Sequence, residues 1–540
     1  EILSGLVGSE MCIRDSYRNA RFFTADDPAW AEAVVVDGAD FAFVGAEADA
    51  PPTDDVVDLG GRVVLPGFTD AHTHLLMMGE ALGQIGLTDA GSLDEIQRRV
   101  QEARETATGA VRGRGWLFDA IPGGSPTAAM IDAVVADIPV YLDANDYHSC
   151  WVNSAALEEL GITRETPDPI GGRIERDADG EPTGMLYETA AQQHAWAHRD
   201  ATTTDEQRDA AVLRVVEAYL AAGVTGAVDM AFDRLALAAL ERAEGRDALP
   251  LRIAAHWFVA NTGDDALNLA QVAEAAERAE TASSAVRVIG IKLVLDGTID
   301  ACTAAMRAPY ADGSNAAPIW PTERLFPVVA AADAAGLQVA LHAIGDQAST
   351  LALDAIEHAI TVNGDRPRRH RIEHLEYAAP GTAERMARLG VTASMQPVHA
   401  DPAIFANWAA QLGDERAERA FAWPEYEDAG ALLAFSTDAP TAPHAALANM
   451  YVATTRASAL EPDTSAVHPQ FALPLARAIA HATRDAAASI GDDAWRGRIA
   501  VGQAADFAVL DVDPFSEGSG SLLTGRVLRT VIGGRTAYEA

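Results

Sequence analysis

Gly290-Ile291-Lys292-Leu293-Val294-Leu295-Asp296-Gly297 is a mainly apolar run that contains the only lysine among the 40 basic residues of the chain. A short apolar run that ends in turn residues is typical of a buried strand. A buried lysine can lose its proton and act as a nucleophile, a base or a carbamate, whereas an arginine stays charged. Lys292 is therefore predicted to have a chemical role that arginine cannot fill. The alternative is that one surface lysine was retained by chance.

Seven further runs resemble this one, and stretches of helical pattern lie between most of them. The eight candidate strands are residues 63–74, 224–230, 251–259, 288–296, 337–342, 371–376, 391–397 and 431–438. Helices are expected at residues 205–222, 265–282, 322–335 and 380–389. Eight strands with crossover helices predict an α/β fold, a (β/α)8 TIM barrel with its active site at the C-terminal ends of the strands.

Both ends of the chain carry shorter strand-like runs, and neither end has enough of them for a stable sheet. Residues 17–64 and 491–540 therefore predict one small β-sandwich domain built from both ends, with the barrel at 65–490 between them. The gap between the first two barrel strands is too long for a loop, so residues 77–201 predict a structured insertion that caps the barrel mouth. Residues 1–16 fit neither a signal peptide nor the strands that follow, and we expect a foreign or unstructured segment there.

Composition excludes several classes of function. The formal net charge of −39 would repel a phosphate backbone, so nucleic acid and anionic membrane are not expected partners. No apolar run reaches the roughly 18 to 20 residues that span a bilayer. Three cysteines make no disulfide framework, which favours a reducing cytoplasm. We expect a globular cytoplasmic protein that acts on a small molecule.

Five potential metal ligands fall at the C-terminal ends of predicted barrel strands. His72 and His74 end the first strand, His342 the fifth, His374 the sixth and Asp438 the eighth. Two histidines separated by one residue on a strand point to the same side and can bind one ion. Because the strand ends meet at one barrel mouth, these residues predict a metal centre there.

A centre with two metal ions needs more negative charge than one aspartate supplies, because two dications repel each other. Carbon dioxide bound covalently to Lys292 would give a carbamate that bridges the ions, and arginine cannot form this group. One alternative is a mononuclear deaminase or hydrolase with an unmodified Lys292. A second alternative is a binding protein that keeps the barrel without catalysis.

Four motifs carry a resemblance to a known family. They are LPGFTDAHTH at 65–74, HAIGD at 342–346, RIEH at 371–374 and STDAP at 436–440. Together they resemble the amidohydrolase superfamily, specifically the amidohydrolase-3 branch of YtcJ-like proteins and N-substituted formamide deformylases. The resemblance implies a barrel with a two-part β-sandwich, zinc as the metal and hydrolysis of a carbon–nitrogen bond. A homodimer is common in that family.

The resemblance also implies a role for each ligand. His72 and His74 with Asp438 would bind the more buried ion, and His342 and His374 the more exposed one. Carboxylated Lys292 would bridge the two ions.

The expected mechanism follows from the charges at such a centre. A bound metal lowers the pKa of its water toward about 7, which makes hydroxide available at neutral pH. Asp438 would take the proton of that water during attack on the carbonyl and pass it to the departing amine. His148 in the insertion could hydrogen-bond the oxyanion, although a structural loop histidine is the alternative. His399 has a weaker claim to the pocket, and Asp346 and Glu373 are expected to orient ligand histidines.

Overall fold

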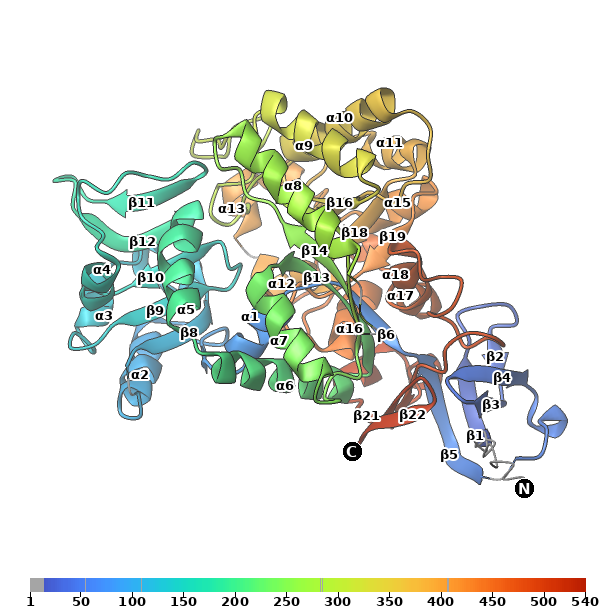
Figure 1. The fold of residues 1–540 in the computed structure, drawn as a ribbon. Helices are drawn as coiled ribbons and strands as arrows, with labels where there is room; N and C mark the ends of the chain where they lie inside the picture. The colour runs from blue at the N-terminus through green and yellow to red at the C-terminus, as the bar shows by residue number, and fades with distance from the viewer. Residues whose placement is uncertain (1–13, 54, 108, 282, 284, 406) are drawn as a thin grey trace, which may run out of the picture.

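The computed structural model describes residues 14–540 apart from residues 54, 108, 282, 284 and 406 (Figure 1). The expectation of a foreign segment at 1–16 therefore lies mostly outside the described residues. Residues 14–16 are not unstructured, because strand β1 (Arg14–Phe23) begins at Arg14. Asp15 and Ser16 pair with Val36 and Val35 of strand β3 (Ala33–Asp37), so they belong to the sheet that follows.

Eight parallel strands form the predicted barrel, in the order β6, β13, β14, β15, β16, β17, β18 and β19. Their bounds are β6 (Phe68–Thr73), β13 (Val224–Phe232), β14 (Arg252–Phe258), β15 (Val286–Val294), β16 (Gln338–Ala343), β17 (Arg371–His374), β18 (Thr392–Met395) and β19 (Leu433–Phe435). The first strand meets the residues that follow the last one, because Asp438 N donates to His72 O at 2.8 Å. The fold prediction is thus confirmed, with the predicted ligands at the strand ends.

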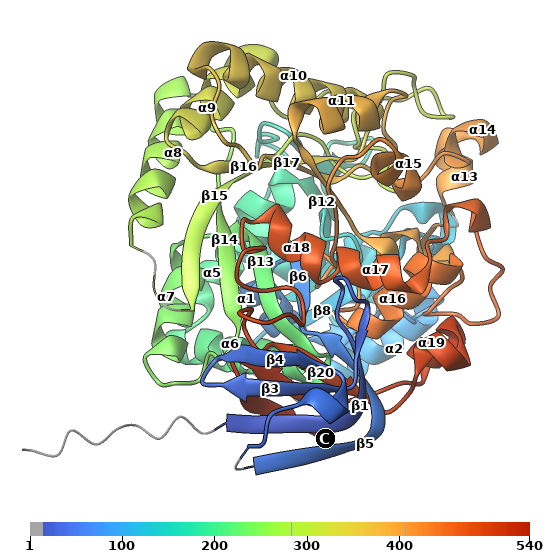
Figure 2. The ribbon, with the colours of Figure 1, turned by 90° about the vertical axis from the view of Figure 1, so that its right-hand side faces the viewer.

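Helices cover the outside of the barrel and connect its strands (Figures 1 and 2). They include α6 (Asp205–Ala221), α7 (Arg234–Glu244), α8 (Asp265–Ala279), α9 (Thr322–Ala334), α10 (Asp346–Asn363), α11 (Thr382–Leu389), α15 (Trp423–Asp428), α16 (Ala446–Thr455), α17 (Leu475–His481) and α18 (Arg484–Ser489). Helix α6 begins with a capping box, in which Thr204 and Gln207 exchange hydrogen bonds between side chain and backbone. Such caps satisfy N–H groups that a helix start leaves open. None of the helices in the described residues has the length and apolar composition needed to cross a membrane.

Strands from both ends of the chain form one sheet beside the barrel, in the order β22-β21-β20-β5-β1-β3-β4 (Figure 2). The strands not yet bounded are β4 (Asp40–Gly45), β5 (Asp55–Pro66), β20 (Phe507–Leu510), β21 (Val527–Ile532) and β22 (Arg535–Glu539). The sheet curls into two layers, because Phe507 of β20 packs on Tyr17 of β1 at 5.0 Å and on Phe41 of β4 at 6.1 Å between ring centroids. This is the two-part sandwich expected from the sequence.

One boundary of the barrel differs from the prediction. Residues 63–66 were assigned to the first barrel strand, but they end β5 and pair with β1 and β20 in the sandwich. The barrel starts after Gly67, where an added Cβ would lie 2.4 Å from the Thr225 side chain. The apolar pattern is continuous across this point, so the sequence did not reveal the change of sheet.

The residues after the first barrel strand form a separate unit with its own sheet. It follows helix α1 (Leu75–Ala81) and has the strand order β11-β12-β10-β9-β8-β7. The strands are β7 (Ile85–Gly86), β8 (Val111–Trp116), β9 (Val140–Ala144), β10 (Ser149–Val152), β11 (Gly172–Arg176) and β12 (Pro182–Glu188). A π-helix, η4 (Ala191–Trp196), and helix α5 (Ala197–Thr202) lead back to the barrel. We call residues 82–202 the cap.

Candidate metal centre

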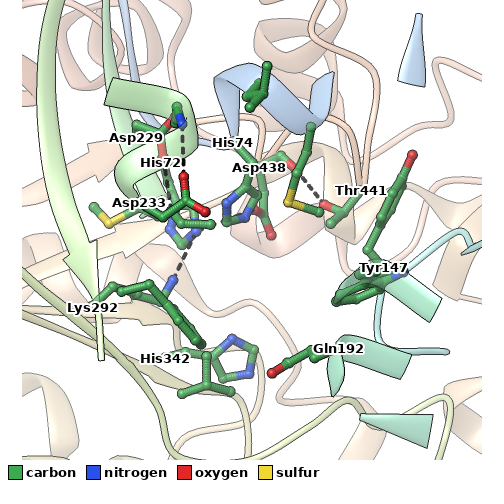
Figure 3. Close-up of a pocket in the computed structure, with 18 of the residues that line it drawn as sticks. His72, His74, Tyr147, Gln192, Asp229, Asp233, Lys292, His342, Asp438 and Thr441 are labelled. Carbon is green, nitrogen blue, oxygen red and sulfur yellow. Dashed lines mark hydrogen bonds and ion pairs between the residues drawn. The ribbon is translucent and has the colours of Figure 1, made fainter. Parts of the chain in front are cut away.

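A cavity of about 250 Å³ lies at the C-terminal ends of the barrel strands, with the cap forming part of its wall (Figure 3). All six predicted metal ligands line it. They are His72, His74, Lys292, His342, His374 and Asp438. Residues 72 and 438 thus line one cavity although they are 366 positions apart in the sequence. They meet because parallel strands end on the same side of the barrel.

The ligand atoms lie close enough for metal binding. One donor atom from each of His72, His374 and Asp438 lies within 4.8 Å of the other two. Asp438 Oδ1 lies 2.9 Å from His74 Nε2 and 3.3 Å from His72 Nε2. The ring of His342 lies 4.4 Å from that of His374, between centroids. Imidazole nitrogens and a carboxylate are ligands that suit zinc.

The buried histidines have the protonation state that metal binding requires. Burial lowers the pKa of His72, His342 and His374 well below the usual value, so each imidazole is neutral. In the described part of the chain, His74 Nδ1 and His342 Nε2 have no hydrogen-bond partner although both atoms are buried. Buried polar atoms without partners are rare. The donor set therefore fits a bound metal.

Lys292 lies inside this ligand set on strand β15. Its side chain is buried, and Nζ lies 3.2 Å from His72 Nε2. Burial lowers the pKa of Lys292 to about 8, although the nearby Glu373 and Asp438 oppose this shift. The amine is thus surrounded by ligand residues and not by solvent.

Glu373 orients the first histidine, as expected. Its Oε2 accepts from His72 Nδ1 at 2.7 Å, so the lone pair of His72 Nε2 is directed toward Lys292 and Asp438. Arg371 binds both oxygens of Glu373, at 2.5 and 3.0 Å, and also donates to Ala71 O. Carboxylates behind ligand histidines fix the tautomer and the ring orientation. Arg371 had no role in the sequence prediction, and its place in the RIEH motif was the only signal for it.

The expected role of Asp346 is wrong. Asp346 starts helix α10, and its Oδ1 accepts from the backbone N–H of Arg307 at 2.8 Å. Asp296 lies near His342 instead, with Oδ1 3.6 Å from His342 Nε2. Backbone N–H groups of Ala305, Ile344 and Gly345 bind this buried carboxylate. Asp296 follows a different barrel strand from His342, so sequence spacing gave no signal for this contact.

The backbone of the centre is strained at three positions. His374, Leu375 and Asp438 have φ values of 73°, 52° and 58°, in the left-handed region that non-glycine residues rarely adopt. Hydrogen bonds hold Asp438 there, because its carbonyl accepts from Thr441 N at 2.9 Å and Thr441 Oγ1 at 2.7 Å. Strain of this kind clusters at functional sites.

The cap contributes polar groups to the same cavity. His148 Nδ1 lies 2.7 Å from Glu188 Oε2, and the His148 ring lies 5.3 Å from that of His342, between centroids. Burial acts against a charge on His148, but Glu188 and Asp146 raise its pKa to about 9. The amide of Gln192 on η4 points into the cavity toward His342 (Figure 3). Glu188 and Gln192 were not predicted.

His399 lies next to the aspartate of the centre. Its Nε2 is 3.7 Å from Asp438 Oδ2 and 3.1 Å from Thr441 Oγ1, and its Nδ1 is 3.0 Å from Glu376 Oε1. His399 thus lies beside Asp438 but does not line the cavity, so the expectation that it reaches the pocket is not met.

Comparison with known proteins places this geometry in a family. The chain matches the Amidohydrolase family over residues 55–538. It is 31% identical to the putative amidohydrolase YtcJ of Bacillus subtilis (strain 168), with 90% of this chain and 91% of that protein covered. It is 28% identical to the N-substituted formamide deformylase of Arthrobacter pascens, with 94% and 95% covered.

A solved structure shows the same arrangement. An uncharacterized metal-dependent hydrolase from Pyrococcus horikoshii OT3 superposes with a TM-score of 0.74 at 25% identity, with 94% of this chain and 99% of that chain covered. The resemblance seen in the sequence motifs is confirmed by the family match. The chain belongs to the amidohydrolase family.

Proposed function

We propose that this protein is a metal-dependent hydrolase that cleaves a non-peptide carbon–nitrogen bond, of the amide or formamide type, in a small molecule. The observation that carries the proposal is the meeting of four histidines, one lysine and one aspartate in a single cavity at the barrel mouth. The similarity to an N-substituted formamide deformylase supports the bond type.

The six residues would hold two zinc ions. His72, His74 and Asp438 would bind one ion, and His342 and His374 the other. Lys292 Nζ would form a bond to the carbon of carbon dioxide with release of a proton, and the resulting carbamate would bridge the ions. When bound, the ions supply Lewis-acid activation of the substrate carbonyl and a water nucleophile at neutral pH.

Asp438 would move the proton in the reaction. Its Oδ1 would accept a proton from the attacking water and deliver it to the leaving nitrogen, because an unprotonated amine anion leaves poorly. Burial opposes the charge of Asp438, but His72 and His74 lower its pKa, so the carboxylate is ionised. His148 would donate from Nε2 to the oxygen that becomes negative, with Glu188 fixing its ring through Nδ1.

A screen of substrates tests the proposal, with Asp438→Asn as the blank. The metal-loaded protein should hydrolyse at least one class among N-substituted formamides, N-acyl amino acids and cyclic amides. Asp438→Asn should keep the fold by circular dichroism and lose about 100-fold or more in kcat, because its amide cannot accept the proton. Near-normal turnover by this variant would contradict the role of Asp438. A purified protein that holds no metal under any condition would favour a binding function.

A mononuclear enzyme is the second candidate, because His72, His374 and Asp438 bring three donor atoms within 4.8 Å of one another, which is enough to hold a single ion. In that case Lys292 would stay an unmodified amine. Metal analysis separates the two candidates. Close to two ions per chain, with reconstitution that depends on bicarbonate, supports the binuclear centre, and one ion without bicarbonate dependence supports the other.

A further inference from the structure

Arg456 is a buried arginine that the metal centre does not use. It follows helix α16, and its side chain is fully buried, at 0% exposure. Nε donates to Val467 O at 3.0 Å and Nη1 to Phe421 O at 3.4 Å. Within the described residues, no carboxylate forms an ion pair with Arg456, and its Nη2 has no hydrogen-bond partner. A buried charge without a counter-charge is costly, so this arrangement needs an explanation.

Aromatic rings enclose the guanidinium. Its central carbon lies 4.4 Å from the ring centroid of Trp423 and 6.0 Å from those of Phe421 and Phe471. Contact with aromatic faces favours a cation but adds no negative charge. The indole Nε1 of Trp423 is also buried and also lacks a partner among the described residues. A buried indole N–H normally finds a hydrogen-bond acceptor. Two unpaired donors therefore lie on side chains that are in contact.

The backbone of this cluster is strained as well. Among the described residues, twelve that are not glycine have a positive φ, and Phe421, Arg456 and His468 have values of 55°, 58° and 51°. Helices usually place glycine or asparagine in a left-handed cap, and Arg456 occupies that position after α16. Strained residues persist where the structure requires their side chains, often at ligand sites. His374, Leu375 and Asp438 at the metal centre also have positive φ values.

We propose that Arg456 Nη2 and Trp423 Nε1 bind a small monovalent inorganic anion of chloride size inside the protein. Both groups are donors only, so their partner must be an acceptor. A single negative charge would neutralise the guanidinium, which a water molecule would not do. Both donor atoms are buried away from solvent, so an anion that binds them must be small. The site is separate from the metal ligands, and its role is to stabilise the fold.

Thermal unfolding of the metal-loaded full-length protein tests the site. Chloride replaces gluconate at constant ionic strength, so that the screening of protein charges by salt stays constant. The midpoint temperature of unfolding of the wild-type protein should rise by about 2 °C or more with chloride concentration and then reach a plateau, because a ligand that binds only the folded state stabilises it. Arg456→Met should remove the chloride response. Trp423→Phe keeps an aromatic ring but removes the N–H. It should raise, several-fold, the chloride concentration that gives half of the full stabilisation.

Arg368→Met is the matched control. Arg368 is also a buried arginine, but it pairs with Asp333 at 2.7 Å. This variant should be less stable than the wild type and keep the full chloride response. A chloride response that is absent in the wild type, or equal in Arg456→Met, would overturn the proposal.

A crystallographic measurement decides the question if Arg456→Met does not fold. Bromide replaces chloride in wild-type crystals, and its anomalous signal locates it. The expected result is a bromide peak within hydrogen-bond distance of both Arg456 Nη2 and Trp423 Nε1. A site that shows no bromide would also overturn the proposal.

Discussion

Lys292 shows how far one residue can be interpreted before a structure is known. Its apolar neighbours predicted a buried strand, and it lies in β15, where its Nζ is 3.2 Å from His72 Nε2. The chain uses arginine at every other basic position. Arginine is longer, stays charged and cannot form a carbamate. The location of Lys292 next to His72 therefore supports a chemical role more strongly than the rarity of lysine in this chain does.

Replacing Lys292 tests this hypothesis directly. Lys292→Arg should reduce the metal content from two ions to at most one per chain, and activity should fall by at least about 100-fold, because the bridging carbamate is lost. Metal analysis after dialysis measures the first effect. Lys292→Met controls for the size of arginine, since it is neutral and close to lysine in length. If either variant still binds two ions, the carbamate hypothesis is wrong.

The residues that meet in the cavity could be predicted, whereas most of their hydrogen-bond partners could not. His72, His342 and His374 were identified because parallel strands end at one barrel mouth and the period of a strand fixes the side of each residue. Glu373 was identified by its place next to a ligand. The same argument failed for Asp346, because the start of α10 turns its carboxylate toward the Arg307 backbone. Partners supplied by other loops depend on the tertiary fold, which spacing does not encode.

At the scale of elements, patterns located every barrel strand but not every boundary. The eight predicted runs correspond to β6 and β13 to β19. The error at residues 63–66 arose because residues 63–68 form one apolar stretch that passes from the end of β5 in the sandwich to the start of β6 in the barrel. The pattern specifies a strand, while pairing partners decide the sheet to which it belongs.

The π-helix η4 is an element that the sequence did not predict and that positions a polar side chain. Wide turns of this kind are rare and often occur at functional sites. Gln192 and Trp196 of η4 line the cavity, and the next glutamine, Gln193, is exposed to solvent. The amide of Gln192 can therefore bind the polar part of a substrate beside His342 (Figure 3).

Two adjacent glutamines provide a matched test of this role. Gln192→Ala should lower kcat/KM by about three- to tenfold, since one hydrogen bond contributes about 0.5 to 1.5 kcal/mol. Gln193→Ala should leave kcat/KM unchanged. Both variants should unfold at the wild-type temperature. Equal effects of the two substitutions on kcat/KM would show that Gln192 does not bind substrate.

At the scale of the whole molecule, the C-terminal segment connects the sandwich to the base of the barrel. Arg496 is buried, binds Asp492 at 2.8 Å and donates to Thr69 Oγ1 of β6 at 3.0 Å. A Cβ at Gly226 of β13 would lie 2.3 Å from the guanidinium, so only glycine leaves room for it there. The side chain thus lies against the paired strands β6 and β13 at the base of the barrel.

Loss of Arg496 should therefore destabilise both domains together. Arg496→Met should lower the free energy of unfolding by about 2 kcal/mol, because the variant loses the hydrogen bonds to Asp492 and Thr69 while Arg287 still pairs with the Asp492 carboxylate. Arg498→Met is the control, since Arg498 is partly exposed and lies 3.4 Å from Asp26, and exposed pairs contribute less than about 1 kcal/mol. Calorimetry of the full-length protein should show one transition in both variants, at a clearly lower temperature for Arg496→Met. Two separate transitions, or equal midpoints for the two variants, would mean that this arginine does not couple the sandwich to the barrel.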